Sequence, residues 1–282
     1  MMVNPARSLD RFPLIRTRNS DEMCAALERV YAKPVLGFAA QTKEVDVAIN
    51  YLPVNYTGLG NTRYGIGVSL IYPDSDVIMQ TFPVTGRGEA AVDHCVGRLD
   101  RWHGVIVSPG MKFTVKLAEN YETLLLVIKP QALLSKLAAI TGRSVNGPLK
   151  FDPLQDYSRP AAKVLREHFL FLVEMVGACA APLPKLLLAE YEETLAMMCL
   201  HANRHNHSHL LERPTPDAAL WQVCRAEEYI AANGGRAISV EELADVTGVS
   251  ALSLFRSFKR NRGYSPRQFM ARLRSSREDT LR

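Results

Sequence analysis

The chain has 282 residues, enough to bury a sizeable core and to form two domains. Its 47% hydrophobic and 22% charged residues are the composition of an ordinary globular protein, and a net charge of +5 does not by itself indicate a nucleic-acid partner. Five cysteines at long spacings, with no C-x-x-C pair, argue against a disulfide framework or a zinc knuckle. Because we find neither a signal peptide nor an apolar run long enough to span a bilayer, we expect a reduced, cytoplasmic protein without membrane contacts.

The first half of the sequence has the pattern of a β-domain. Residues 1–40 carry few signals, but apolar and polar residues then alternate over residues 45–51, 64–72 and 111–117. This alternation predicts half-buried strands. Turn-forming residues separate the runs at 58–61, 73–76, 86–88 and 108–110. We therefore expect a sandwich or small barrel whose last strand covers residues 124–128.

The period then changes to that of a helix. Apolar residues at helical spacing predict helices over residues 130–140, 160–176 and 185–203. Pro130 suits a first helical turn, and Gly142 marks the expected end of the first helix. The polar, His-rich stretch 201–217 contains two prolines and reads as a linker. The apolar stripe of these helices has no obvious second partner, so we expect it to pair two subunits.

Beyond the linker the sequence predicts three or four short helices. The first covers residues 221–233 and is closed by Gly234 and Gly235. A capping box follows, with Ser239 as the N-cap and Glu242 reaching back to it. This box opens a short helix over residues 240–247.

A tight turn leads into the next helix. Gly248 ends the short helix, Ser250 caps a helix over residues 251–260, and Gly263 ends that helix. A helix, a glycine turn and a second helix at this spacing are typical of DNA-binding proteins. A further helix begins with Ser265, Pro266 and Gln268. The small core between the helices is expected to contain Leu243, Ala244, Val249, Leu254 and Phe258.

Positive charge is concentrated in this region. Between residues 250 and 277 there is no Asp or Glu, and the basic residues are Arg256, Lys259, Arg260, Arg262, Arg267, Arg272, Arg274 and Arg277. The preceding helices are acidic. Phosphates would lie against the basic part, which predicts double-stranded DNA as a partner. The alternative interpretation is a helical bundle with a solvated basic face.

The segment ISVEELADVTGVSALSLFRSFKRNRGYSPRQF, which starts at Ile238, resembles the AraC/XylS family of transcription regulators. The resemblance implies that the exposed face of the helix at 251–260 reads DNA bases, and only Arg256 on that face can bind guanine in a bidentate way. Carried over by position, the base-contacting residues are Ala251, Leu252, Ser253, Phe255 and Arg256. The phosphate-contacting residues are Ser250, Lys259, Arg260, Ser265 and Arg267.

The N-terminal region also resembles this family. Three segments, GVIVSPG at 104–110, LLLVIKPQAL at 124–133 and LKFDP at 149–153, are similar to its cupin-like, effector-sensing domain of the AraC-binding type. The resemblance implies a small-molecule effector, whose identity the sequence does not reveal. Aromatic residues on the strands could line the effector pocket, although about half of them are expected to be barrel core. Those we assign to the pocket are Tyr51, Tyr64, Tyr72, Trp102 and Phe113.

Together these observations predict an α+β chain. Residues 1–150 form a cupin-like β-barrel, residues 151–213 a helical dimerisation segment with its linker, and residues 218–282 an all-α helix-turn-helix domain. The expected function is that of a sequence-specific, effector-responsive activator, with RNA polymerase as a candidate partner and no cofactor. The family normally has a second helix-turn-helix, but the resemblance fades after Arg274, so we expect the second unit to be missing. A truncated sensor or antagonist that dimerises but activates poorly is therefore one alternative.

The other alternative is a metal-dependent cupin enzyme. Such barrels hold their metal with two closely spaced histidines, a carboxylate and a later histidine. The barrel region here offers only His94 and His103, and it has no H-x-H pair. A denser set lies at a helix end and in the linker, at His201, His205, His207 and His209. We expect no metal site and no enzyme, since G-x-S-x-G, P-loop and G-x-G-x-x-G motifs are also missing from the sequence.

Overall fold

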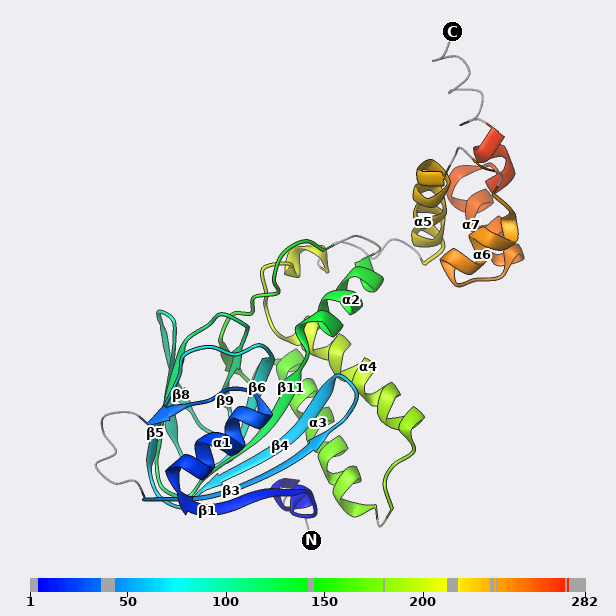
Figure 1. Ribbon diagram of the computed structural model, residues 1–282. Helices are drawn as coiled ribbons and strands as arrows, with labels where there is room; N and C mark the ends of the chain where they lie inside the picture. The colour runs from blue at the N-terminus through cyan, green and yellow to red at the C-terminus, as the bar shows by residue number, and fades with distance from the viewer. Residues whose placement is uncertain are drawn as a thin grey trace. The chain divides into compact units, whose positions relative to one another are not determined.

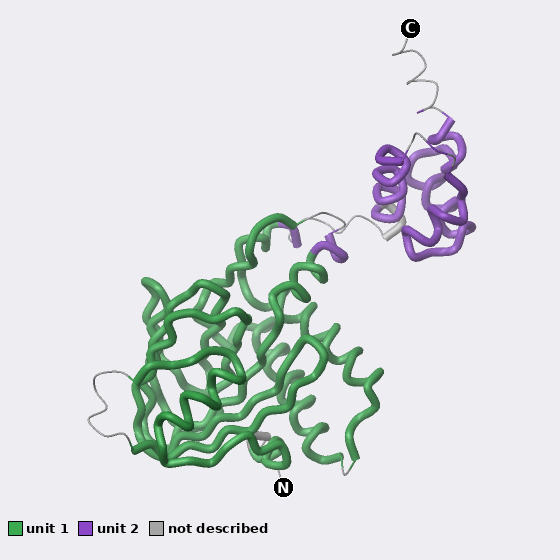
Figure 2. Tube along the Cα trace, viewed as in Figure 1, with its two compact units in different colours: residues 1–137, 145–209 green, residues 138–144, 210–282 purple. Residues whose placement is uncertain are grey.

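The computed structural model describes residues 5–36, 44–141, 145–179, 181–211, 218–233, 236, 238–271 and 273. The chain divides into two compact units (Figure 1, Figure 2). Unit 1 contains residues 1–137 and 145–209, and unit 2 contains residues 138–144 and 210–282. Each unit has its own cluster of buried apolar side chains.

Unit 1 is built on two antiparallel sheets. Within the described residues, the first sheet has seven strands in the order β1 (Pro13–Asn19), β3 (Glu44–Pro53), β4 (Thr57–Tyr64), β11 (Tyr121–Ile128), β6 (Ile78–Thr85), β9 (His103–Val107) and β12 (Leu154–Asp156). The second, counted over the same residues, has five, in the order β2 (Val35–Leu36), β5 (Val68–Tyr72), β10 (Phe113–Leu117), β7 (Gly88–Val92) and β8 (Cys95–Leu99).

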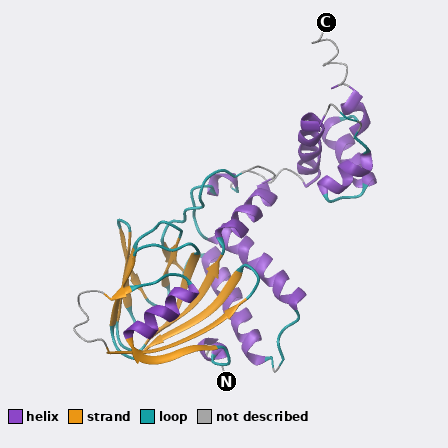
Figure 3. Ribbon diagram, viewed as in Figure 1, coloured by secondary structure: helices purple, strands orange, loops and turns teal. Residues whose placement is uncertain are grey.

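The two sheets share one apolar core and pack as a β-sandwich (Figure 3). Val47 and Ile49 of β3 lie in the same buried cluster as Leu70 of β5 and Val115 of β10. Strand β3 confirms the predicted alternation, because its apolar positions are buried while its first charged residues are exposed. Strand β11 is buried at every position and pairs with β4 on one edge and β6 on the other.

Helices flank the two sheets in the structure. They are α1 (Ser20–Val30), α2 (Pro130–Thr141), α3 (Pro160–Ala178) and α4 (Lys185–Ala202), together with the short 3-10 helices η1 (Pro5–Leu9) and η2 (Ser208–Leu210). The predicted helices at 130–140, 160–176 and 185–203 are therefore confirmed. Helix α3 packs against η1 and α4. Helices α3 and α4 belong to the same compact unit as the sheets, although the sequence predicted a boundary near residue 150.

A buried carboxylate joins α4 to the sandwich. Glu192 accepts hydrogen bonds from the backbone amides of Asn55 and Tyr56, both at 3.1 Å. It also accepts from the backbone amide of Thr57 at 3.0 Å and from its hydroxyl at 2.7 Å, and the Asn55 side-chain amide donates to it at 2.6 Å. A carboxylate out of water needs such partners, because desolvation penalises its charge. Glu192 thus fixes the turn between β3 and β4 against α4.

Two strand predictions need correction. The predicted turn at 58–61 lies inside β4, because the side chain of Tyr51 covers these glycines. A Cβ on Gly58 would lie 1.9 Å from the Tyr51 hydroxyl oxygen, so glycine here gives space to a ring and does not form a turn. The predicted single strand at 64–72 is two strands, since β4 ends at Tyr64 and β5 begins at Val68.

Other elements had no clear sequence signal. The segment before residue 40 contains β1 and α1, and Asn19 caps α1 by accepting from the amides of Asp21 and Glu22. The sheet also continues beyond the strand expected to be its last, because β12 pairs with β9. The predicted helix stop at Gly142 lies outside the described residues.

Unit 2 contains helices only, within the residues described. These are α5 (Ala218–Asn233), α6 (Val240–Thr247) and α7 (Ala251–Arg262), and residues 266–271 are also helical. The expected closing glycines, Gly234 and Gly235, and linker residues 212–217 lie outside the described residues. Of the helices in the described chain, none has the length and apolar character needed to cross a membrane.

Candidate functional site

The turn between α6 and α7 is fixed by local caps. The hydroxyl of Ser239 accepts from the Glu242 amide at 3.0 Å, and that of Ser250 accepts from the Ser253 amide at 3.2 Å. Gly248 ends α6 in the left-handed region at φ +68°, where a Cβ would be strained. The sequence predicted all three positions, and the short connection sets the angle at which α7 leaves α6. The predicted return contact of the capping box to Ser239 is only a minor one, because the Glu242 carboxylate accepts mainly from Tyr229 at 2.6 Å and from Arg236 at 3.2 Å.

The inner face of α7 is anchored in the core of unit 2. Leu254 and Phe258 are fully buried, together with Leu243 of α6 and Val223 and Ile230 of α5. The expected core residue Ala244 is also buried, and Val249 packs at the edge of the cluster. Because one face of α7 is anchored in this way, the opposite face must be exposed.

Polar contacts also hold α7 to α5. Arg262 forms a two-pronged ion pair with Glu227, with both N–O distances at 2.9 Å. The hydroxyl of Ser257 donates to Gln222 at 2.9 Å. These contacts were not predicted, because the partners are 35 residues apart and no local spacing relates them. Arg262 therefore orients α7, although it belongs to the basic set found in the sequence.

The exposed face of α7 is apolar and basic. Leu252 is 60% exposed and Phe255 is 43% exposed, and Arg256 and Lys259 are exposed beside them. These four positions follow the i, i+3, i+4, i+7 spacing of one helix face. The flanking residues Ala251 and Ser253 are half-buried. The structure thus brings together the residues expected to contact bases.

The residues expected to contact phosphates lie around this face. Arg260 and Arg267 are exposed, like Lys259. Ser250 caps α7, and Ser265 exchanges two hydrogen bonds with Gln268, confirming the predicted capping box. Each serine lies where unpaired backbone amides gather at a helix N-terminus, a favourable place for an anion. Arg272, Arg274 and Arg277 lie outside the residues whose side chains are described.

A second candidate site is the interior of the sandwich. A cavity of about 30 Å³ lies between the sheets. Tyr64, Tyr72 and Phe113 line it, and the Tyr72 and Phe113 rings stack at 4.3 Å. The hydroxyls of Tyr31 and Tyr72 are 2.7 Å apart. Burial raises the pKa of Tyr72 well above its usual value, which keeps its phenol neutral. A cavity of this size holds about two water molecules, so a larger ligand requires these rings to move.

The other two aromatic residues predicted for the pocket lie elsewhere. Tyr51 packs over Gly58 and Gly60 at the edge of the core and does not line the cavity. Trp102 is 41% exposed, and the guanidinium of Arg101 lies over its ring. Trp102 lies in the turn between β8 and β9 and not on a strand face, so its assignment to the interior is corrected.

A sequence profile of the AraC-binding-like domain matches residues 23–201. The chain belongs to the AraC-binding-like domain family. The profile spans the sandwich except for β1, together with α3 and nearly all of α4, which agrees with their grouping in one compact unit. The expected cupin-like fold is confirmed at the level of a β-sandwich with helices.

Solved structures give distant likenesses to this AraC-binding-like protein. The crystal structure of the AraC-like transcriptional activator CuxR matches over 94% of this chain and 94% of its own, at 15% identity and a TM-score of 0.49. The cupin domain of Cnp3 from Schizosaccharomyces pombe matches over 36% of this chain and 77% of its own, at 14% identity and a TM-score of 0.29. No curated protein matches the sequence.

The histidines of the AraC-binding-like domain are dispersed. Nδ1 of His103 lies 2.7 Å from an Asp100 oxygen, and Arg98 also contacts this ring. His94 lies in the turn between β7 and β8. His205 is buried, and burial lowers its pKa to about 4. Across the described residues, no group of three or more His, Cys, Asp or Glu side chains is arranged to hold a metal ion.

Proposed function

We propose that this AraC-binding-like protein is a sequence-specific DNA-binding transcription regulator, in which α6 and α7 form a helix-turn-helix and α7 enters the major groove. The exposed face of α7 carries the proposal. Two large apolar side chains, Leu252 and Phe255, lie in water beside Arg256, in a segment without Asp or Glu from residue 250 to 271. An anchored helix with such a face suits the major groove, which is wide enough to admit one.

Within this proposal each side chain has a distinct role. Arg256 donates to the O6 and N7 acceptors of guanine, and Leu252 and Phe255 contact thymine methyl groups. Ala251 and Ser253 flank them at the start of the helix. Contacts to phosphate, which position the protein without reading sequence, are made by Ser250, Lys259, Arg260, Ser265 and Arg267.

We further propose that the regulator acts as a dimer. Helices α3 and α4 leave several large apolar side chains exposed, and Val164 and Phe171 fall two turns apart on one face of α3. The others, on α4, are Leu186, Leu187 and Met197. An apolar surface of this kind is typical of an interface between subunits. In such a dimer, the two copies of unit 2 would bind one DNA site together, and their two weak half-site contacts would combine.

Effector-dependent activation, with RNA polymerase as a partner, is the expected mode of action. The interior between the two sheets is the proposed effector site, with Tyr64, Tyr72 and Phe113 on its walls. Because the present cavity holds only water-sized molecules, effector binding would have to reorient these aromatic rings.

DNA selection tests the proposal. The purified full chain is incubated with random-sequence duplexes, and bound DNA is amplified and sequenced over several rounds. We expect one enriched motif containing a guanine that Arg256→Ala no longer selects. Failure to enrich any motif, together with the same weak retention of all duplexes, would contradict a sequence-specific role and leave the basic face of α7 as a solvated surface.

A further inference from the structure

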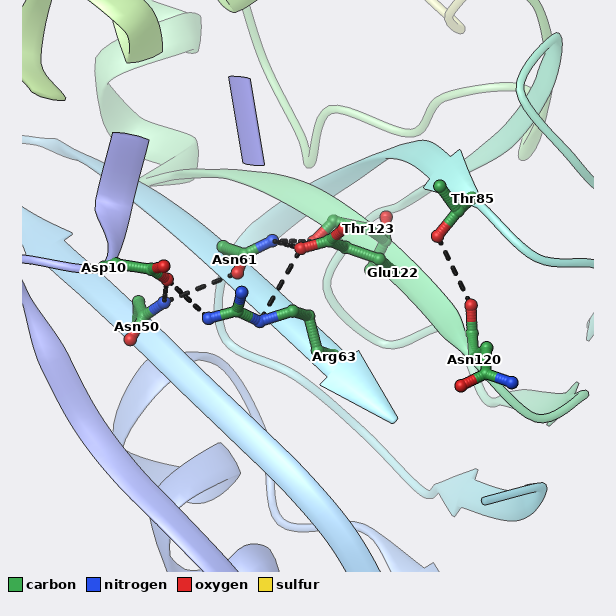
Figure 4. A network of polar contacts seen from close by, with 8 residues as sticks. All are labelled: Asp10, Asn50, Asn61, Arg63, Thr85, Asn120, Glu122 and Thr123. Carbon is green, nitrogen blue, oxygen red and sulfur yellow. Dashed lines mark hydrogen bonds and ion pairs between the residues drawn. The ribbon is translucent and has the colours of Figure 1, made fainter. Parts of the chain in front are cut away.

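The outer face of the seven-stranded sheet carries a cluster of charged and amide side chains (Figure 4). Arg63 of β4 lies between two carboxylates, forming an ion pair with Asp10 and another with Glu122 at 3.6 Å. Asn50 donates to Asp10 at 3.0 Å, and Asn61 donates to Glu122 at 3.3 Å. This network lies where η1 contacts β3, β4 and β11.

Glu122 is an unusual residue for its position. It occupies a central strand that is buried along its whole length, and it is itself only 8% exposed. Removing a carboxylate from water is costly unless partners compensate it. The contacts to Arg63 and Asn61 engage the same oxygen, Oε1. The second oxygen makes no hydrogen bond to the described part of the chain, although Glu122 lines an open cleft.

This cleft has a volume of about 340 Å³. Its size lies in the range of small-molecule sites, roughly 300–1,000 Å³, whereas the interior cavity is far smaller. Four strands contribute to its walls, and the residues lining it are Asp46, Ala48, Arg63, Tyr64, Gly65, Thr85, Asn120, Tyr121 and Glu122.

The rim of the cleft is shaped by two local features. The Asp46 carboxylate lies against Gly65, where an added Cβ would come within 2.1 Å of Oδ2, so glycine leaves room for the acid. On the other side, the hydroxyl of Thr85 donates to the backbone carbonyl of Asn120 at 3.3 Å and joins β6 to the turn before β11 (Figure 4). Asp46 makes no hydrogen bond through its side chain to any described residue.

We propose that this cleft binds a small organic cation that also carries hydroxyl groups, a protonated amino-polyol of monosaccharide size. The carboxylates of Asp46 and Glu122 line the cleft, and their unused oxygens accept from an ammonium group. Among the described residues that line the cleft, only Arg63 is positive, and it is already paired with two acids, so the local charge favours a cation. The Nη1 group of Arg63 and the side chain of Asn120 supply donors for the hydroxyl oxygens.

The charged residues of this binding site face away from the interior between the sheets, because Arg63 and Glu122 point to the outer face while the neighbouring Thr62 and Thr123 line the inner cavity. Tyr64 and Tyr121 line both the cleft and the cavity. Because side chains alternate between the two faces along β4 and β11, each face of the sheet carries different polar residues. Binding in the cleft does not depend on whether unit 2 binds DNA.

Three matched sugars test the proposal by calorimetric titration of the full chain. D-glucosamine carries the ammonium group, D-glucose is neutral, and D-glucuronate is anionic. We expect glucosamine to bind at millimolar concentration or tighter, glucose to bind about tenfold more weakly, and glucuronate not to bind. Equal affinity for all three sugars, or no heat with glucosamine, would overturn the proposal.

Two variants locate the site. Glu122→Gln and Asp46→Asn each remove one charge with little change of shape, and each should weaken glucosamine binding about tenfold. Asp46 is exposed and makes no side-chain hydrogen bond, so Asp46→Asn stays informative if Glu122→Gln disturbs folding. Glu89→Gln, the same change at an exposed site of the other sheet, is the control and should leave affinity unchanged. Retention of full affinity in both cleft variants would contradict the assignment.

Discussion

The two units of this protein differ in how buried their polar side chains are and in how far along the chain their hydrogen-bond partners lie. In unit 1, buried polar side chains form hydrogen bonds between parts of the chain that are far apart. Glu192, for example, accepts from the amides of residues 135 to 137 positions earlier. Gln80 and Asn203, 123 residues apart, likewise exchange two buried hydrogen bonds of 3.1 Å. Unit 2 uses contacts three residues apart at its caps, pairs Arg262 with Glu227, and leaves Arg256, Lys259 and Arg267 exposed. Substitution of a buried polar residue that joins distant parts of unit 1 should therefore change stability, whereas substitution of an exposed basic residue on α7 should change DNA binding.

The largest effect is expected for Glu192→Ala. This variant leaves the buried amide of Thr57 and the partly buried amides of Asn55 and Tyr56 without their acceptor, and an unsatisfied buried donor costs about 1–3 kcal/mol. We expect the free energy of unfolding to fall by about 3 kcal/mol, measured by urea denaturation. Glu190→Ala, at an exposed position of the same helix, should change it by less than about 0.5 kcal/mol. Similar stabilities for the two variants would show that Glu192 does not hold the turn.

A pH dependence is expected from His205. Burial holds its pKa at about 4, below the usual value of 6.5, so the unfolded state binds a proton between these values that the folded state does not. Stability should therefore fall as the pH is lowered from about 6.5 towards 4, by up to about 1.4 kcal/mol for each pH unit. His205→Gln should flatten this dependence, whereas His201→Gln, at an exposed site, should not. Parallel pH profiles for His205→Gln and the unchanged protein would contradict it.

In unit 2 the sharpest test compares three arginines. Arg256→Ala should cost about 1–3 kcal/mol of DNA affinity and relax the preference at one base pair, because it removes a bidentate base contact. Arg262→Ala should lower the melting temperature of the chain, since its partner is Glu227 and not DNA. Arg225→Ala, exposed on α5, is the control for general loss of charge. Fluorescence anisotropy on the selected duplex measures the DNA affinity of all three variants, and thermal denaturation measures the melting temperature of Arg262→Ala. Equal weakening by Arg256→Ala on every sequence would reassign Arg256 to phosphate.

The smallest effects concern phosphate contacts. Lys259→Ala and Arg260→Ala should weaken binding to all duplexes alike, because phosphates carry no sequence information. Each should also reduce the slope of log affinity against log salt by about one, since fewer counterions are released. Affinity measured from low to high salt gives this slope. A changed base preference with an unchanged slope would place either residue at the base edges.

The same contrast explains what the sequence could predict. In unit 2, Ser239, Gly248 and Ser250 were identified because caps depend on residues only three or four positions away. In unit 1 the alternation of apolar and polar residues predicts β3, but the glycines at 58 and 60 predict a turn that does not form. Only the ring of Tyr51, brought over them by strand pairing, explains their place in a strand.

The candidate sites divide in the same way. Helical spacing and charge are enough to predict which residues lie on the exposed face of α7. The pairing of Arg262 with Glu227 and the cleft formed by Asp46, Arg63 and Glu122 could not be predicted, because each joins residues from separate elements. Trp102 was misplaced for a related reason, since an aromatic residue in a turn and one on a strand look alike in sequence.

The hydrogen bonds between Glu192 and the β3–β4 turn also determine when unit 1 can complete its folding during synthesis. The turn at residues 55–57 leaves the ribosome long before Glu192 is made, and until then water must satisfy its amides. Closing so distant a contact is slow, because the entropy of a long loop must be overcome first. The nascent sandwich therefore waits for α4 before its β3–β4 end can close, and a ribosome that pauses before residue 192 would hold that end open.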